Sequence, residues 1–125
     1  MVTQMLRVFL NSKIHRATVT ERDLNYVGSI SIDADLLKAA GMLPDEKVDI
    51  YNISNGERFS TYILEAPAGS GMIGLNGAAA HKVNLHDKVI IVTYNYLAEK
   101  EIPHRKSTVI VIESEDNLKH RELEK

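Results

Sequence analysis

The sequence predicts a mainly β protein, folded as a small barrel or sandwich with a few short helices. Short segments that alternate polar and apolar residues, or that are rich in Val, Ile, Thr and Tyr, recur along most of the chain. Turn sequences rich in Gly, Asn, Asp and Pro separate these segments at short intervals. Helical patterns, by contrast, are few and brief. Many short strands joined by tight turns are typical of a closed or double-layered β structure.

Six segments are expected to form strands, at 13–20, 25–32, 48–53, 58–64, 89–94 and 107–112. In the first, alternation predicts that His15, Ala17 and Val19 share one face. Gly28 interrupts the second, and a glycine inside a strand pattern is typical of a bulge or of a close backbone approach. The continuous apolar run at 89–94 suits a strand that is buried on both faces.

Two short helices and one hairpin are expected between the strands. Asp33 is suited to cap a helix that Gly41 ends, and 76–80 could add one more turn. The Asn55-Gly56 pair is the strongest hairpin signal, because both central residues of a type I′ turn need positive φ.

Two segments of the chain resemble each other. Residues 42–50 align with residues 83–91: in each, an acidic residue precedes Lys-Val, and an Ile follows two positions later. The match indicates two related halves, as in a pseudo-symmetric barrel, although so short a match could equally arise by coincidence.

A chain of 125 residues is the usual size of one domain. We expect a single barrel domain at 1–112. The remaining segment, 113–125, is a polar tail with only Leu118 and Leu123 as large apolar residues, and its composition predicts a solvated, disordered tail.

The composition excludes several classes of function. The formal net charge of -2 gives no reason to expect a nucleic-acid or membrane partner. No apolar run approaches the roughly 20 residues that span a bilayer. Because the chain has no cysteine, disulfides and thiolate chemistry are excluded. We expect a cytoplasmic protein.

Two familiar kinds of site find little support. The five histidines lack the i, i+4 spacing of a helical zinc site, so we expect no metal and interpret them as surface or supporting residues. A serine hydrolase could be drawn from Ser29 with His15 or His81, but any chain of this length permits such a triad. Gly69-Ser70-Gly71 matches the Gly-x-Ser-x-Gly elbow only in part.

Three blocks in register carry a family resemblance. They are Tyr26-Val27-Gly28-Ser29, the segment 55–62 (Asn-Gly-Glu-Arg-Phe-Ser-Thr-Tyr), and 76–81 (Asn-Gly-Ala-Ala-Ala-His), preceded by a strand that begins Lys13-Ile14-His15-Arg16-Ala17. Together they resemble the aspartate 1-decarboxylases, enzymes that carry a pyruvoyl group, from about residue 5 to residue 94. The chain departs from the pattern at Tyr51, where some members carry an indole side chain, and after Leu97.

The resemblance implies a double-psi β-barrel that cleaves itself between Gly28 and Ser29, giving a β chain of residues 1–28 and an α chain of residues 29–125. Ser29 would become the pyruvoyl cofactor, without a metal or pyridoxal phosphate. The implied reaction converts L-aspartate to β-alanine and carbon dioxide for pantothenate and coenzyme A synthesis. The implied assembly is a homotetramer with active sites between subunits.

Each site residue takes its role from the resemblance. Ser29, as the pyruvoyl group, would form a Schiff base with the substrate, and Tyr62 would donate the proton. Gly28, Ser29 and Thr61 would serve self-processing. The substrate-binding residues would be Lys13, Arg58, Thr61, Asn76, Gly77, Ala78 and Ala79. Without the resemblance, Thr61 and Tyr62 would be interpreted as ordinary strand residues.

The expected strand at 58–64 poses a geometric conflict for the site residues. Arg58 and Tyr62 are four apart on an expected strand, so they share a face, and Thr61 points the other way unless a bulge intervenes.

The rival function is a noncatalytic β-barrel module that binds a partner through its Asn-Gly hairpin and glycine-rich loops.

Overall fold

The computed structural model describes residues 4–124 and has the mainly β fold that the sequence predicts. The strands are β1 (Leu6–Thr18), β2 (Glu21–Asp23), β3 (Ser29–Asp33), β4 (Lys47–Asn52), β5 (Arg58–Ala66), β6 (Ile73–Asn76), β7 (Lys88–Ala98), β8 (Thr108–Ile112) and β9 (His120–Glu122). The helices are α1 (Ala34–Ala40) and two 3₁₀ segments, η1 (Gly77–Lys82) and η2 (Glu99–His104). The class is therefore confirmed, with a helix content as low as expected.

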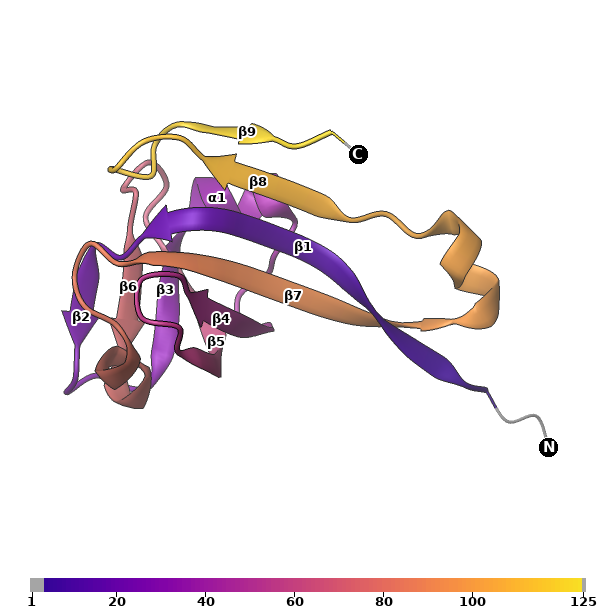
Figure 1. Ribbon diagram of the computed structural model, residues 1–125, viewed down its shortest axis with the longest axis horizontal. Helices are drawn as coiled ribbons and strands as arrows, with labels where there is room; N and C mark the ends of the chain where they lie inside the picture. The colour runs from indigo at the N-terminus through magenta and orange to yellow at the C-terminus, as the bar shows by residue number, and fades with distance from the viewer. Residues whose placement is uncertain (1–3, 125) are drawn as a thin grey trace.

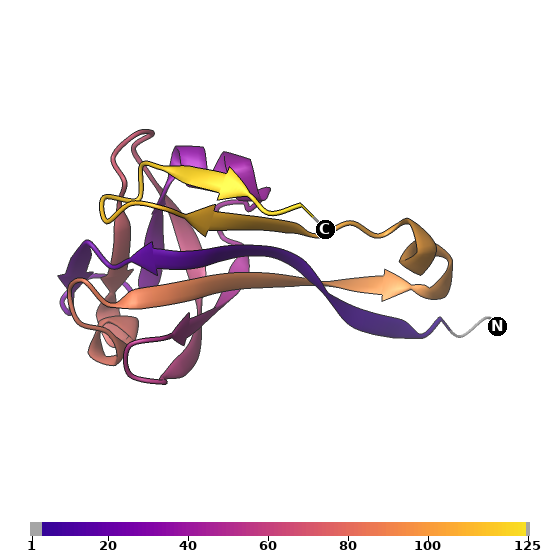
Figure 2. The ribbon, with the colours of Figure 1, turned by 45° about the horizontal axis from the view of Figure 1, so that its top comes forward.

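The strands form one continuous sheet in the order β2-β6-β3-β5-β4-β7-β1-β8-β9. Figures 1 and 2 show β1 and β7 as a long ribbon, with β3 and β6 crossing behind it. The sheet returns on itself, because the backbone N–H of Thr20, just after β1, donates to the Ile73 carbonyl of β6 at 2.9 Å. A curled sheet around one core is what the expected double-psi β-barrel requires.

The core is built mainly from β-branched and other aliphatic side chains. Isoleucine dominates the fully buried positions, which include Ile14, Ile30, Ile32, Ile50, Ile63, Ile73, Ile91 and Ile110. Helix α1 contributes Leu36 and Leu37 to the same cluster. Branched side chains pack well on a pleated surface, so the composition that predicts strands also fills the barrel. Among the described residues no helix is long and apolar enough to cross a membrane.

The two similar sequence segments have the same turn geometry. Asp45 and His86 occupy equivalent positions and have φ of 70° and 73°. The acidic side chains that follow them, on Glu46 and Asp87, each accept a hydrogen bond from the backbone N–H three residues earlier, at 3.0 and 2.9 Å. The two turns therefore share a left-handed residue and a matching side-chain cap at equivalent positions.

Each of these turns also bonds to one residue elsewhere in the sheet. The first exchanges two backbone hydrogen bonds with Ile63 of β5, and the second exchanges two with Val19, just after β1. The similarity of the two segments therefore extends to their turn geometry and to the two backbone hydrogen bonds that each turn makes with the sheet.

Strand β1 differs from its prediction in length and in alternation. It begins at Leu6, seven residues before the expected start. Its register against β7 shifts between Ile14 and Ala17, where Arg16 has φ of 66°. Ile14 and Ala17 are both fully buried across this bulge, whereas His15 is only half-buried. The prediction that His15 shares the buried face of Ala17 is wrong, because the bulge changes the parity of the strand.

The segments around Gly28 and Asn55 are also looser than predicted. Strand β3 starts only at Ser29, so the chain before it is a turn. Of the two central hairpin residues only Gly56, with φ of 79°, lies in the left-handed region. Asn52 pairs with Glu57 across the loop, through a backbone hydrogen bond of 2.9 Å from the Asn52 N–H. The hairpin is present, but it has four loop residues and no type I′ turn.

Helix α1 has the ends that the sequence predicts. The Asp33 carboxylate accepts the Asp35 N–H at 2.8 Å, and Gly41 closes the helix with φ of 72°. The same carboxylate also accepts the backbone N–H groups of Gly69 and Gly71, at 3.0 and 2.8 Å. One buried aspartate therefore ties the helix to the turn before β6.

The C-terminal segment is ordered in the structure, which differs from the disordered tail that its composition predicts. Strand β9 pairs with β8. Asn117 is 1% exposed, accepts the Thr18 N–H at 2.8 Å, and donates to the carbonyls of Thr18 and Gly71 at 2.8 and 2.9 Å. The composition does not predict this order, because the segment is held by the hydrogen bonds of the buried Asn117 amide more than by burial of apolar side chains.

Candidate active site

Ser29 lies at the start of β3 and is completely buried. It pairs with Asn76 on β6, whose side-chain amide donates to the Ser29 Oγ at 3.0 Å and to the Ser31 Oγ at 3.1 Å. The Ser29 hydroxyl donates in turn to the Val27 carbonyl at 3.2 Å. Two of the predicted site residues, from blocks 47 residues apart in sequence, are thus in direct contact.

Gly77 brings the start of η1 against the peptide that precedes Ser29. It has φ of 66°, and a Cβ there would lie 2.6 Å from the Gly28 Cα and 2.7 Å from the Tyr26 carbonyl oxygen. A Cβ on Gly28 would instead meet the Ala78 nitrogen at an ordinary 3.9 Å. The close backbone approach expected at Gly28 is therefore present, and Gly77 is the residue that makes it sterically possible.

Replacing Gly77 with alanine should destabilise the protein by more than the cost of a left-handed alanine alone, because the new Cβ would also clash with the backbone at Gly28. A left-handed alanine costs about 1–2 kcal/mol, and at Gly77 its Cβ must also push the backbone around Gly28 aside. We expect a lower unfolding midpoint and a loss of any chemistry that depends on the geometry of Gly28 and Ser29. Gly56→Ala is the matched control, because Gly56 has φ of 79° and open space around it. Equal effects of the two substitutions on both measurements would contradict this role.

The register of β5 separates the two candidate residues Thr61 and Tyr62. In the parallel pairing with β3, Ile63 lies beside Ile30, so Tyr62 lies beside Ser29 one position earlier on each strand. Side chains at neighbouring register positions point to the same face. Thr61 has the parity of the buried Ile63, and the register between β4 and β5 runs without a bulge. Tyr62 thus shares the face of Ser29, and Thr61 points toward the opposite face.

The two candidate cations lie on the same face as Tyr62. Lys13 of β1 pairs with Val92 of β7, Val92 with Asp49 of β4, and Asp49 with Ser60 of β5. This row of paired residues places Lys13 on the same face as Ser60. Arg58 and Tyr62 lie two residues to either side of Ser60 on β5, so they share that face. Strands β7, β4 and β5 lie between β1 and β3 in the sheet. Ser29, Arg58 and Tyr62 thus share a face on the neighbouring strands β3 and β5, whereas Lys13 lies on the same face but is separated from β5 by β4 and β7.

Arg58 is exposed and lies over an aromatic ring. Its guanidinium carbon is 3.9 Å from the centroid of Tyr51, the residue opposite it on β4. The Tyr51 hydroxyl is 2.8 Å from the hydroxyl of Tyr94 on β7. That hydrogen bond, together with burial, raises the pKa of Tyr94 to about 12. A guanidinium stacked on a ring keeps its N–H edges available for a carboxylate.

Comparison with known proteins gives these features a context. A family model described as aspartate decarboxylase matches residues 5–119. The chain belongs to the aspartate decarboxylase family. Among its relatives, the aspartate 1-decarboxylase of Caulobacter vibrioides is 54% identical over 91% of this chain and 96% of its own length. The enzyme of the same name from Staphylococcus aureus is 54% identical over 91% of this chain and 89% of its own length. That of Aliarcobacter butzleri is 53% identical over 87% and 86%.

The family match extends beyond the part of the chain that the sequence motifs cover. It continues past Leu97 through η2, β8 and the loop that contains Asn117. In this family member the buried Asn117 amide links the end of β1 to the turn before β6, which leads to Asn76. The segment without a recognised motif is thus part of the fold that supports the site.

Two residues on the face that carries Arg58 and Tyr62 are not among the candidates predicted from the sequence. Lys47 lies opposite Tyr62 on β4, and Tyr94 bonds to Tyr51 from β7. Lys47 could have been found, because 47–52 alternates and places Lys47, Asp49 and Tyr51 on one side. Tyr94 could not, because its contact depends on the pairing of β4 with β7.

His15 is the most unusual histidine of the described residues. Its Nδ1 is buried and has no hydrogen-bond partner among them. Burial, and then the neighbouring charges of Lys13 and Arg16, lower the pKa of His15 below its ordinary value. The imidazole is therefore neutral at neutral pH, and it adds no third cation beside Lys13. Within residues 4–124, no group of His, Asp and Glu side chains is arranged to hold a metal ion.

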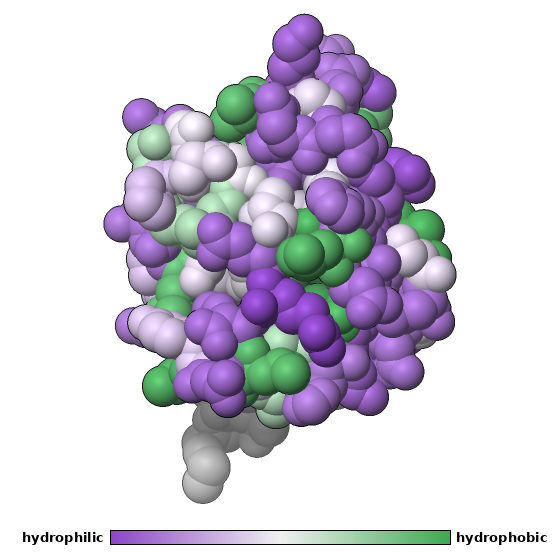
Figure 3. Space-filling view, turned by 90° about the vertical axis from the view of Figure 1, so that its left-hand side faces the viewer, coloured by the Kyte–Doolittle hydropathy of each residue, from purple (hydrophilic) through white to green (hydrophobic). Residues whose placement is uncertain are grey.

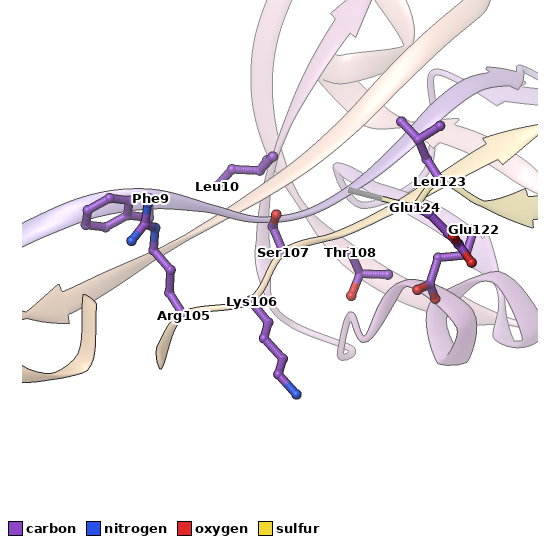
Figure 4. A pocket seen from close by; sticks show the side chains of 9 residues that line it. All are labelled: Phe9, Leu10, Arg105, Lys106, Ser107, Thr108, Glu122, Leu123 and Glu124. Atoms are coloured by element: carbon purple, nitrogen blue, oxygen red, sulfur yellow. The ribbon is translucent and has the colours of Figure 1, made fainter. Parts of the chain in front are cut away.

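A cleft of about 820 Å³ lies away from these residues, along the half of β1 that β8 does not cover. Figure 4 shows Arg105 beside Phe9 in this cleft, with its guanidinium carbon 4.8 Å from the ring centroid. None of the predicted site residues lines it.

Figure 3 shows that apolar side chains on the end of the molecule with β2 and η1 form small separate groups among hydrophilic ones.

Proposed function

We propose that this chain decarboxylates L-aspartate to β-alanine and carbon dioxide in the cytoplasm, supplying pantothenate and coenzyme A synthesis. It does so after cleaving itself between Gly28 and Ser29. The observation that carries the proposal is the buried Ser29 hydroxyl, held by Asn76, directly after a glycine against which Gly77 packs. Membership of the aspartate decarboxylase family supplies the substrate.

The surroundings of Ser29 fit a pyruvoyl group formed from that residue. The Asn76 amide lies within hydrogen-bond distance of residue 29, and Gly28, Gly77 and Ala78 present backbone in place of bulky side chains. When present, the group supplies an electrophilic carbonyl that accepts the electrons released as carbon dioxide leaves. The chemistry proposed here uses neither a metal nor pyridoxal phosphate.

Self-cleavage begins with the Ser29 hydroxyl as nucleophile. Its oxygen attacks the Gly28 carbonyl carbon, the Gly28–Ser29 amide breaks, and the acyl group is carried as an ester on Ser29. Elimination of that ester releases the Gly28 carboxylate and leaves dehydroalanine at position 29, which water converts to pyruvoyl with loss of ammonia. A hydroxyl donor is needed at the oxyanion of the first step, and we assign it to Thr61. This assignment of Thr61 rests on the resemblance alone, because the register points its side chain to the face opposite Ser29.

The remaining residues bind and protonate the substrate. Aspartate carries two carboxylates, and Arg58 and Lys13 supply two positive charges on one face. Backbone N–H groups of the small residues Gly77, Ala78 and Ala79 can approach a carboxylate closely. Tyr62, beside Ser29 in the register, donates a proton to the carbon that has lost carbon dioxide.

The site is completed between copies of the chain, in a homotetramer. The side chains of Tyr62, Arg58 and Lys13 lie on the outer face of a small barrel whose interior is filled with isoleucine, so we expect the substrate to bind outside the core. The β1–β7 ribbon projects from the core, with Leu6 and Val8 more than half exposed. A two-stranded ribbon is marginal in water by itself, so packing against another copy would stabilise it.

Denaturing mass spectrometry of the purified protein tests the proposal. We expect two fragments separated after Gly28, with the larger one lighter than its unmodified sequence by one ammonia. Release of carbon dioxide from L-aspartate should accompany them. A single intact chain with no aspartate-dependent release after long incubation would favour the rival, a noncatalytic β-barrel that binds a partner through its loops.

A further inference from the structure

A chain of three contacts links strand β7 to the cation on β5. The Tyr94 hydroxyl lies 2.8 Å from the Tyr51 hydroxyl, and the Tyr51 ring lies under the Arg58 guanidinium at 3.9 Å. The backbone supports the same alignment, because Tyr51 pairs with Arg58 on one side and with Ile90 on the other. Each of the three strands β7, β4 and β5 therefore contributes one member.

The Arg58 guanidinium is held by its stacking more than by an opposite charge. Three ion pairs occur among residues 4–124, between Lys82 and Glu57, Lys88 and Glu115, and Arg121 and Glu113, and none uses Arg58. The nearby Asp49 carboxylate accepts a hydrogen bond from the Ser60 hydroxyl at 2.8 Å. The direction of the Arg58 fork thus depends on where the Tyr51 ring lies.

We propose that Tyr94 is a positioning residue for substrate binding: its hydroxyl holds the Tyr51 ring in place, and the ring holds the Arg58 guanidinium edge-outward for a substrate carboxylate. Tyr94 touches no reacting atom. The inference rests on the proposed function, in which Arg58 binds a carboxylate of aspartate.

The state of the Tyr94 hydroxyl suits this role. The hydrogen bond to Tyr51, together with burial, raises its pKa, so the group keeps its proton throughout the neutral range. A protonated hydroxyl can remain in the 2.8 Å bond whether or not a substrate is present. Phenylalanine at this position would keep the ring and lose only the bond, so the substitution isolates the hydroxyl.

The test compares Tyr94→Phe with Tyr96→Phe in the self-cleaved enzyme. Tyr96 lies two residues along the same strand, on the same face, and is 71% exposed. A neutral hydrogen bond contributes about 0.5–1.5 kcal/mol, so we expect the KM for L-aspartate to rise roughly 2- to 10-fold in Tyr94→Phe. The kcat and the extent of self-cleavage should stay near wild type, and the unfolding midpoint should fall by no more than the loss of one hydrogen bond accounts for. Tyr96→Phe should match wild type in all four.

Succinate separates binding from chemistry, because it carries both carboxylates but no amine. Its inhibition constant should rise in Tyr94→Phe by the same factor as the KM. Tyr51→Phe should show a similar rise, and the double variant should be no worse than either single one, since both remove the same bond. Additive effects of the two substitutions, or a Tyr94→Phe enzyme with unchanged KM and unchanged succinate inhibition, would overturn the proposal.

Different outcomes test the proposed function and the role of Tyr94. A wild-type chain that neither cleaves nor releases carbon dioxide would remove the proposed function itself. A wild-type chain that does both, with the kinetics of Tyr94→Phe unchanged, would leave the function standing and remove only the role of Tyr94. A fall in kcat without a change in KM would also count against positioning of the carboxylate.

Discussion

Replacing Ser29 with alanine should leave one intact chain that releases no carbon dioxide from L-aspartate. The hydroxyl oxygen of Ser29 is the proposed nucleophile at the Gly28 carbonyl, and alanine has none. Because the pyruvoyl group forms only after this attack and the elimination that follows it, cleavage and turnover should be lost together. We expect denaturing mass spectrometry to show the full-length mass, and activity to fall to background.

The fold should survive this change. Ser29 is buried, and removal of its hydroxyl deprives the Asn76 amide of one acceptor, at a cost of about 1 kcal/mol. The amide keeps its second acceptor, the Ser31 hydroxyl at 3.1 Å. Ser31→Ala is therefore the matched control: it removes the other acceptor of the same amide and should still cleave after Gly28. A Ser29→Ala chain that cleaves normally would exclude Ser29 as the nucleophile.

The parts of the fold that the sequence predicts are those set by local patterns. The helix caps at Asp33 and Gly41 were predictable because each places a specific residue at a helix end. The aligned segments around Asp45 and His86 predicted a repeat, and both turns have the left-handed residue and the same cap. Such features depend on a few neighbouring residues, and those residues are visible in the sequence.

The parts that differ depend on distant partners. The bulge at Arg16 follows from pairing with β7, and it reverses the faces that simple alternation assigns to His15 and Ala17. The buried Asn117 amide is held by groups 99 and 46 residues away in sequence. A polar composition cannot reveal such bonds, so it predicts disorder where the structure has an ordered loop.

The candidate site shows the same division. Motifs in register supplied Ser29 and Asn76, which the structure joins at 3.0 Å. Strand alternation separated Thr61 from Tyr62, and the uninterrupted register of β5 keeps them on opposite faces. The contact between Tyr51 and Tyr94 could not be predicted from the sequence, because it joins two strands through residues that are 43 positions apart.

Replacing Tyr62 with phenylalanine should leave self-cleavage intact and remove most turnover. Tyr62 lies beside Ser29 in the register, on the face that we propose binds the substrate, so we expect its hydroxyl to serve turnover and not self-cleavage. A phenol is a weak acid that gives up its proton only when a strong base forms beside it. Loss of a positioned proton donor typically costs about 10²- to 10⁴-fold in rate. We therefore expect two fragments on denaturing mass spectrometry and a kcat lowered by that factor.

The effect on binding distinguishes a proton donor from a packing residue. Phenylalanine keeps the ring of the half-buried Tyr62, and Arg58 and Lys13 are untouched, so inhibition by succinate should stay near wild type while kcat falls. Thr61→Val provides the complementary case, since it removes the hydroxyl that faces the other way. That variant should slow cleavage, and its cleaved fraction should turn over nearly as well as wild type. A Tyr62→Phe enzyme with normal kcat would exclude Tyr62 as the donor, and a Tyr62→Phe chain that fails to cleave would place its hydroxyl in self-processing instead.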